Sequence, residues 1–201
     1  MLKPLAVVAL ALVLAACQPA GESTPAAPKV TFNAVDITGA EYGRKLDLPD
    51  ADGRMRSLAD WKGKVAIVFF GYTQCPDVCP TTLAEIAALK RQLGADGDKV
   101  QAVFVTLDPE RDSPELLKGY MANFGPGFVA LRGTPAQTQA AALEFKVFYS
   151  KVPGKVENHY TIDHTAGAYV IDPQGRLRLF VRYGGGLDKL GADVKALLAG
   201  A

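Results

Sequence analysis

Apolar positions along the chain fall into runs and periodic patterns that alternate between strands and helices. Two runs, 65–72 (VAIVFFGY) and 100–107 (VQAVFVTL), are largely apolar and rich in β-branched and aromatic residues, which is typical of strands buried on both faces. Between them, apolar residues at 83, 86, 87, 89 and 93 have helical spacing. This spacing predicts an amphipathic helix over 81–94 that ends at Gly94.

Helix caps and turn residues predict the other elements. Ser113 and Thr134 each stand directly before a proline, and a cap residue followed by proline marks the start of a helix. The remaining expected elements are a turn, a short strand and a turn over 53–64, helices over 113–125, 134–147 and 187–200, a strand over 128–133, and two strands within 167–183 joined by a turn at 172–175. Strands that alternate with helices indicate an α/β fold, and the tight turn adds an antiparallel pair, which makes its central sheet mixed.

The N-terminal residues have the pattern of a targeting segment. The apolar run 5–16 is shorter than the roughly 20 residues that span a bilayer, and it suits a secretory signal peptide. It ends in small residues directly before Cys17, which resembles a bacterial lipoprotein cleavage box. That resemblance implies removal of residues 1–16 and a lipid on Cys17. An ordinary secretory signal with an incidental cysteine is the alternative.

The next residues predict a flexible tether and place the domain. Residues 18–29 are rich in Pro, Ala, Ser and Gly, so we expect 17–33 to form a lipidated N-terminus and tether that reaches roughly 20 Å. The rest, 34–201, is long enough for one domain with a full core. We therefore expect a lipid-anchored domain on the periplasmic side of a bacterial membrane. With 22 Lys and Arg against 21 Asp and Glu, the whole chain lacks the basic excess of a nucleic-acid-binding protein.

Cys75 and Cys79 lie between the first buried strand and the helix after it, where active groups concentrate in open α/β sheets. A purely structural disulfide is the simplest interpretation in an oxidising compartment. It would close a loop of only five residues, and a disulfide across so short a loop adds only about 2 kcal/mol to the stability of the folded protein. Amide groups at a helix N-terminus favour thiolates, so we expect low thiol pKa values and a pair able to form a disulfide or bind one ion. Pro80 is a candidate for the first helical position, with Cys79 as the cap.

Two histidines are the candidates for a third ligand. His159 and His164 are the chain's only histidines, and both lie in the segment 158–172, which we interpret as a loop leading into a strand. In a thioredoxin-like layout such a loop lies beside the helix that carries the cysteines. One histidine then completes a metal site; a merely solvated histidine is the alternative. Asp163 is a candidate to orient His164, with an exposed acid as the alternative.

Three motifs together resemble the Sco/SenC copper chaperones, which have a thioredoxin-like fold. They are FFGYTQCPDVCP (69–80), VTLDPERDSP (105–114) and YTIDHTAGAYVID (160–172). The resemblance spans about residues 34–200, with the motifs in the family's order. We interpret the Asp-Pro segment mainly as a turn followed by the helix cap at Ser113.

The resemblance implies a ligand set and a cargo. Cys75, Cys79 and His164 correspond to the family's copper ligands, and His159 to a surface residue. Soft thiolates select Cu(I), and imidazole accepts Cu(I) and Cu(II). Zinc in a structural site takes four ligands, so a set of three ligands does not suit structural zinc. Three ligands also leave one side of the metal open, from which a partner can take it.

The resemblance also implies partners. We expect copper delivery to the copper-bearing subunit of cytochrome c oxidase, with another periplasmic copper chaperone or a thiol reductant acting on this protein. Many family members carry a transmembrane helix where this chain has its lipid signal. Two enzymes remain as alternatives: a thiol–disulfide oxidoreductase that reduces the oxidase cysteines, and a thiol peroxidase that passes through a sulfenic acid. The segment 163–167 (DHTAG) lacks the proline that faces the thiols in thioredoxin, which makes exchange on peptide substrates less expected.

Overall fold

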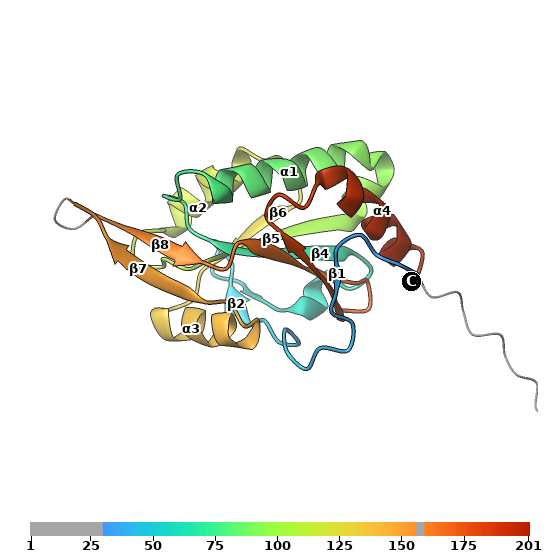
Figure 1. Ribbon diagram of the computed structural model, residues 1–201. Helices are drawn as coiled ribbons and strands as arrows, with labels where there is room; N and C mark the ends of the chain where they lie inside the picture. Colours follow the sequence, from blue (N-terminus) through green and yellow to red (C-terminus); the bar gives the residue numbers. More distant parts are fainter. Residues whose placement is uncertain (1–29, 156–158) are drawn as a thin grey trace, which may run out of the picture.

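A mixed six-stranded sheet forms the centre of the protein (Figure 1). The computed structural model describes residues 30–155 and 159–201. The strand order is β1-β10-β9-β4-β5-β6, in which β4, β5 and β6 run parallel and the other pairs are antiparallel. These strands are β1 (Val35–Asp36), β4 (Val65–Gly71), β5 (Val100–Thr106), β6 (Phe128–Leu131), β9 (Gly167–Ile171) and β10 (Leu177–Arg182). The predicted α/β fold with a central mixed sheet is confirmed.

Helices cover both faces of this sheet. In Figure 1, α1 and α4 lie together on one face and α3 lies on the other. The helices are α1 (Val78–Gln92), α2 (Pro114–Ala122), α3 (Pro135–Glu144) and α4 (Leu187–Leu198), with 3-10 turns η1 (Leu58–Trp61) and η2 (Gly94–Lys99). The predicted caps are confirmed: the Ser113 hydroxyl accepts from the Leu116 N–H at 3.2 Å, and the Thr134 hydroxyl from the Gln137 N–H at 3.3 Å.

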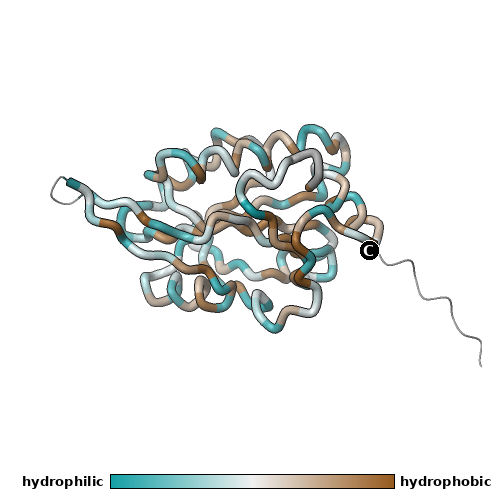
Figure 2. The backbone as a smooth tube through the Cα atoms, in the orientation of Figure 1, coloured by the Kyte–Doolittle hydropathy of each residue, from teal (hydrophilic) through white to brown (hydrophobic). Residues whose placement is uncertain are grey.

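The core is built from the predicted apolar runs. All seven residues of β4 are buried, and six of the seven residues of β5 are buried beside it. Figure 2 shows the hydrophobic residues gathered in these central strands. A strand buried on both faces places its C-terminal end at a fixed point between the helix layers, so the residues that follow β4 start from a rigid support.

Three local predictions differ from the structure. The helix after β4 begins at Val78 and not at 81, because the chain turns into the helix directly after Asp77. Pro80 is therefore the third helical residue, which the first turn tolerates because its amide needs no helical partner. In the region 53–64 the predicted short strand is present as β3 (Met55–Arg56), which pairs with β2 (Leu48–Pro49), but the 3-10 turn η1 follows it where a simple turn was predicted.

The largest difference is a hairpin that the sequence pattern did not predict. Strands β7 (Tyr149–Pro153) and β8 (Tyr160–His164) pair with each other antiparallel and form a sheet of their own. The hairpin projects from the domain in Figure 1. Four of the five β7 residues are exposed, so β7 has no apolar face that marks a strand in the sequence. The segment interpreted as a loop around His164 is therefore mostly strand.

Candidate metal centre

The two cysteines are held close together by the turn between β4 and α1. The Cys75 N–H donates to the Tyr72 carbonyl at 3.3 Å, which closes the turn after β4. Cys79 is the second residue of α1, and its N–H donates to the Cys75 Sγ at 3.4 Å. One of the unpaired amides at the start of the helix therefore points at the first sulfur. Cys75 is half-buried and Cys79 is buried, and both are free thiols.

His164 reaches this pair from the end of β8. Its Nε2 lies 3.6 Å from the Cys79 Sγ, and one ligand atom from each of the three residues lies within 4.8 Å of the others. Among the described residues this is the one group of three or more Cys, His, Asp or Glu side chains spaced to hold a metal ion. His159 lies exposed next to the hairpin tip. The predicted meeting of Cys75, Cys79 and His164 is thus present in the fold.

The hydrogen bond at the far side of the imidazole fixes which nitrogen faces the thiols. The His164 Nδ1 lies 3.1 Å from the Thr165 carbonyl oxygen. Because a carbonyl only accepts, this contact assigns the proton to Nδ1 and leaves the Nε2 lone pair toward Cys79. Asp163, a candidate to orient the ring, does not do so: side chains alternate along β8, and Asp163 is the exposed acid that was the alternative.

Burial controls the ionisation of the site. It raises the pKa of the Cys79 thiol, and the neighbouring Cys75 side chain raises it further. The expectation of a lowered thiol pKa is therefore wrong for Cys79, because it has no exposed surface and its amide is directed at the other sulfur. Burial also lowers the pKa of His164, which keeps the imidazole neutral near pH 7, the form that binds metals.

Aromatic rings and a glycine shape the space around these groups. The rings of Phe69 and Tyr72 stand edge-on to the His164 ring, with centroids 6.0 and 6.2 Å away. Gly71 lies beside the second thiol: a Cβ atom there would stand 2.8 Å from the Cys79 Sγ. No pattern in the sequence points to this contact, because Gly71 is simply one residue of the apolar run 65–72.

Gly71→Ala is expected to displace the Cys79 thiol, since nonbonded atoms pack at about 3.5–4.0 Å. We expect a loss of stability of about 1–3 kcal/mol, as for other overpacked core sites, together with weaker metal retention. Urea unfolding and metal content after desalting measure both effects. Gly119→Ala is the matched control, because nothing lies within 4 Å of a Cβ built at that helical position. A Gly71→Ala protein with wild-type stability and metal content would contradict this role.

The Asp-Pro segment 105–114 holds the cysteine turn through hydrogen bonds to Asp112. This role could not be predicted from the sequence pattern. Asp112 is fully buried and accepts from the Thr73 and Thr106 hydroxyls at 2.5 Å each, and from the Thr73 N–H. These bonds hold the chain between β4 and Cys75 against the end of β5. The segment was interpreted as a turn and a cap; its acids also anchor the neighbouring loop.

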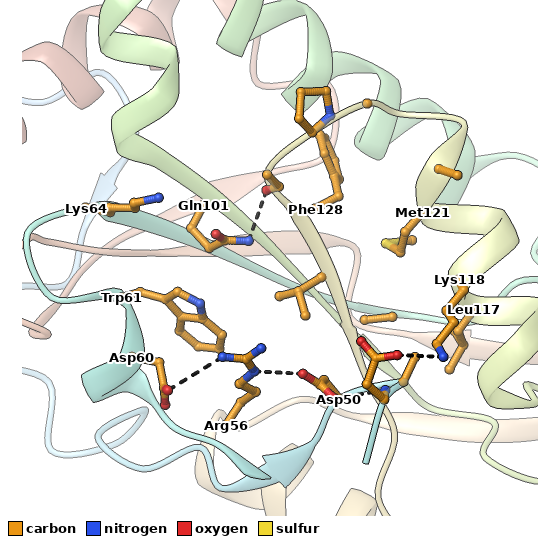
Figure 3. Close-up of a pocket in the computed structure, with 18 residues that line it drawn as sticks. Asp50, Arg56, Asp60, Trp61, Lys64, Gln101, Leu117, Lys118, Met121 and Phe128 are labelled. Atoms are coloured by element: carbon orange, nitrogen blue, oxygen red, sulfur yellow. Dashed lines mark hydrogen bonds and ion pairs between the residues drawn. The ribbon is translucent and has the colours of Figure 1, made fainter. Parts of the chain in front are cut away.

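A groove elsewhere on the described surface has a different character. It has a volume of about 560 Å³, and none of its lining residues is a cysteine or a histidine. Two ion pairs lie in it: Arg56 with Asp50 at 2.8 Å, and Lys118 with Asp52 at 2.6 Å (Figure 3). The reactive groups of the protein therefore lie at the thiols and not in this groove.

Comparisons with known proteins agree with this site. The sequence model of the SCO1/SenC family matches residues 35–199. The SCO2-like protein of Rickettsia prowazekii is 36% identical over 155 residues, which is 77% of this chain and 76% of that protein. A structure of Bradyrhizobium japonicum ScoI with copper bound is 40% identical, covers 79% of this chain and 99% of that one, and has a TM-score of 0.71.

A more distant structure, BsSco, shares the fold. It is 24% identical, covers 84% of this chain and 99% of that one, and has a TM-score of 0.64. It is described as having a disulfide switch and as a member of the Sco family of cytochrome c oxidase assembly proteins.

The fold and the site define the class as a thioredoxin-like domain that brings two thiols and a neutral imidazole together at the end of its central strand. The chain belongs to the SCO1/SenC family. Within the described residues, none of the helices combines the length and the apolar character needed to cross a bilayer.

Proposed function

We propose that this protein is a copper chaperone that binds copper through Cys75, Cys79 and His164 and delivers it to the copper centre of cytochrome c oxidase. The observation that carries the proposal is the meeting of two thiols and one imidazole nitrogen within 4.8 Å, in a chain 40% identical to a protein with copper bound. Membership in a family described as assembling cytochrome c oxidase supports the choice of target.

The chemistry of the three groups suits a cargo that must be released. Two thiolates and an imidazole form a soft set that favours Cu(I), and the imidazole also accepts Cu(II). Copper binding displaces the Cys79 proton, so the buried thiol becomes a thiolate only when the metal arrives. Cys75 and His164 are only half-buried, which leaves a side from which a partner's ligand can approach. A disulfide between the cysteines removes both thiolates, so we expect copper binding to depend on redox state.

A thiol–disulfide oxidoreductase is the second candidate, and one observation favours it. Cys75 is partly exposed while Cys79 is buried behind it, an arrangement in which one thiol meets a target disulfide and the other resolves the mixed disulfide. In this function the reduced dithiol gives two electrons to the target's disulfide and becomes a disulfide itself. It does not require His164 as a ligand.

Copper transfer separates the two functions. Copper-loaded protein is mixed with the soluble copper-bearing domain of cytochrome c oxidase, prepared without metal and with its cysteines reduced, and metal-free protein with a reduced dithiol is mixed with the same domain in its oxidised form. The chaperone function predicts that copper moves to the reduced target. Reductase function alone predicts new thiols on the oxidised target and no copper movement to the reduced one, and that result would overturn the chaperone proposal.

The anchor and the location are part of the proposal and rest on the sequence. Cys17 lies outside the described residues. Removal of residues 1–16, a lipid on Cys17 and a tether to residue 33 would hold the domain 34–201 on the periplasmic side of the membrane.

Cys17→Ser is expected to release the protein from the membrane fraction, because the acyl chains would be lost. Fractionation of cells and immunoblotting measure this change. Cys75→Ser is the matched control and is expected to stay with the membrane. A Cys17→Ser protein that remains membrane-bound would contradict the lipid anchor.

A further inference from the structure

The position of His164 depends on how the β7–β8 hairpin is held. The hairpin belongs to a separate two-stranded sheet, so no strand pairing fixes it to the central sheet that carries Cys75 and Cys79. Apart from the two residues that join the end of β8 to β9, its attachment comes from side chains. The inward face of β8 presents Tyr160, Ile162 and His164, which alternate with exposed residues along the strand.

One guanidinium joins this face to the cysteine turn. The Arg111 Nη1 donates to the Tyr160 carbonyl at 2.9 Å and to the Gln74 Oε1 at 3.2 Å. Gln74 directly precedes Cys75, and Tyr160 lies four residues before His164 on the same face of β8. Arg111 therefore contacts both of the chain segments that supply the proposed ligands.

Further contacts with Tyr160 and Asp108 hold the guanidinium in place. Its carbon lies 3.5 Å from the centre of the Tyr160 ring, and its Nε is ion-paired with the buried Asp108. The Tyr160 hydroxyl also donates to Asp108, at 2.8 Å. A guanidinium that stacks on a ring while its Nε and Nη1 bind separate acceptors is specific to arginine, because lysine lacks the planar fork.

We infer that Arg111 is a positioning residue of the metal centre, which holds the β7–β8 hairpin so that His164 meets the two thiols. The inference rests on the proposed copper site. Arg111 does not contact the metal ligands itself; it acts through Tyr160 on one side and Gln74 on the other.

Other contacts also attach the hairpin, and the burial of the Ile162 side chain in the core is one of them. Lys151 pairs with Glu110 at 2.5 Å, but both side chains are about half exposed, and such pairs contribute little. The Ile162 N–H donates to the Tyr72 hydroxyl at 3.1 Å, and this bond requires β8 to stay where Arg111 holds it. The exchange rate of that amide therefore reports the position of β8 without any metal.

The test compares Arg111→Met with Arg132→Met. Arg132 binds the carbonyls of Pro109 and Asp112, so it anchors the same loop without touching the hairpin. Two quantities are measured on the full protein: Cu(I) affinity by competition with a chromophoric chelator, and hydrogen exchange of the Ile162 amide in the metal-free state. If Arg111→Met does not fold, Arg111→Lys replaces it in both measurements, because lysine keeps the positive charge and lacks the planar guanidinium.

We expect Arg111→Met to lower Cu(I) affinity by about tenfold, the lower end of the effect of groups that orient metal ligands. Exchange at Ile162 should become faster, and Arg132→Met should change both quantities less, because Arg132 holds the loop without contacting the hairpin. In a His164→Ala background, Arg111→Met should cause no further loss of affinity, since it acts through that ligand.

Each other outcome overturns a specific statement. Unchanged exchange at Ile162, equal losses in the two arginine variants, or an undiminished loss in the His164→Ala background would overturn the positioning role of Arg111. Wild-type protein that binds no Cu(I) while Arg111→Met still speeds exchange would overturn the proposed copper site and retain the structural role of the arginine.

Discussion

Cys79→Ser protein is expected to retain no copper after desalting, whereas the wild type keeps its metal. A serine hydroxyl is a hard and weakly acidic ligand, and at this position it replaces the thiolate next to His164 Nε2. Because Cys79 has no exposed surface, the hydroxyl is also buried, which costs about 1–3 kcal/mol if it finds no partner. Metal analysis and urea unfolding measure the two effects separately.

Cys75→Ser is the control that separates metal binding from folding. Cys75 is half-buried, so its replacement should remove copper binding with a smaller loss of stability than at Cys79. Both variants also lose the capacity to form the intramolecular disulfide. Full copper retention by either variant would contradict the dithiol as the centre of the site.

His164→Ala is expected to weaken copper binding and leave the dithiol chemistry intact. Loss of an outer group that orients a ligand lowers metal affinity by roughly 10–100-fold, so loss of the ligand itself should cost at least as much. The cysteines are held by β4 and α1 independently of the hairpin, so they should still oxidise to a disulfide and be reduced again. Chelator competition measures the affinity, and thiol titration measures the redox cycle.

His159→Ala provides the matched control, because His159 lies exposed near the tip of the same hairpin. We expect this variant to bind copper like the wild type. If His164→Ala kept wild-type affinity, or if His159→Ala lost as much, the assignment of His164 as the third ligand would be wrong.

The sequence predicted the parts of the site that depend on local patterns. The apolar run of β4 and the periodic residues of α1 placed Cys75 and Cys79 at the end of a buried strand. The exact start of the helix stayed open in the sequence, where Pro80 was only a candidate for the first helical position, and the helix begins at Val78.

The other parts depend on contacts between distant segments. The β7–β8 hairpin has no clear apolar alternation, since its outer strand is mostly exposed, so His164 was placed correctly in space but assigned to a loop. Arg111 and Tyr160 are 49 residues apart in the sequence. Because an arginine in an Asp-Pro segment is typical of an exposed turn, its contact with the hairpin could not be predicted. The steric contact of Gly71 with a thiol likewise appears only when the strand and the helix are packed.

The most direct test of the copper site is the copper content of the protein in its two redox states. The protein is reduced under anaerobic conditions, loaded with copper, desalted, and assayed for copper and free thiols; the same assay follows oxidation of the Cys75–Cys79 pair. We expect one tightly held copper per chain in the reduced protein and its loss on formation of the disulfide. A reduced protein with two free thiols and no retained copper would contradict the chaperone function and leave the dithiol as an oxidoreductase centre.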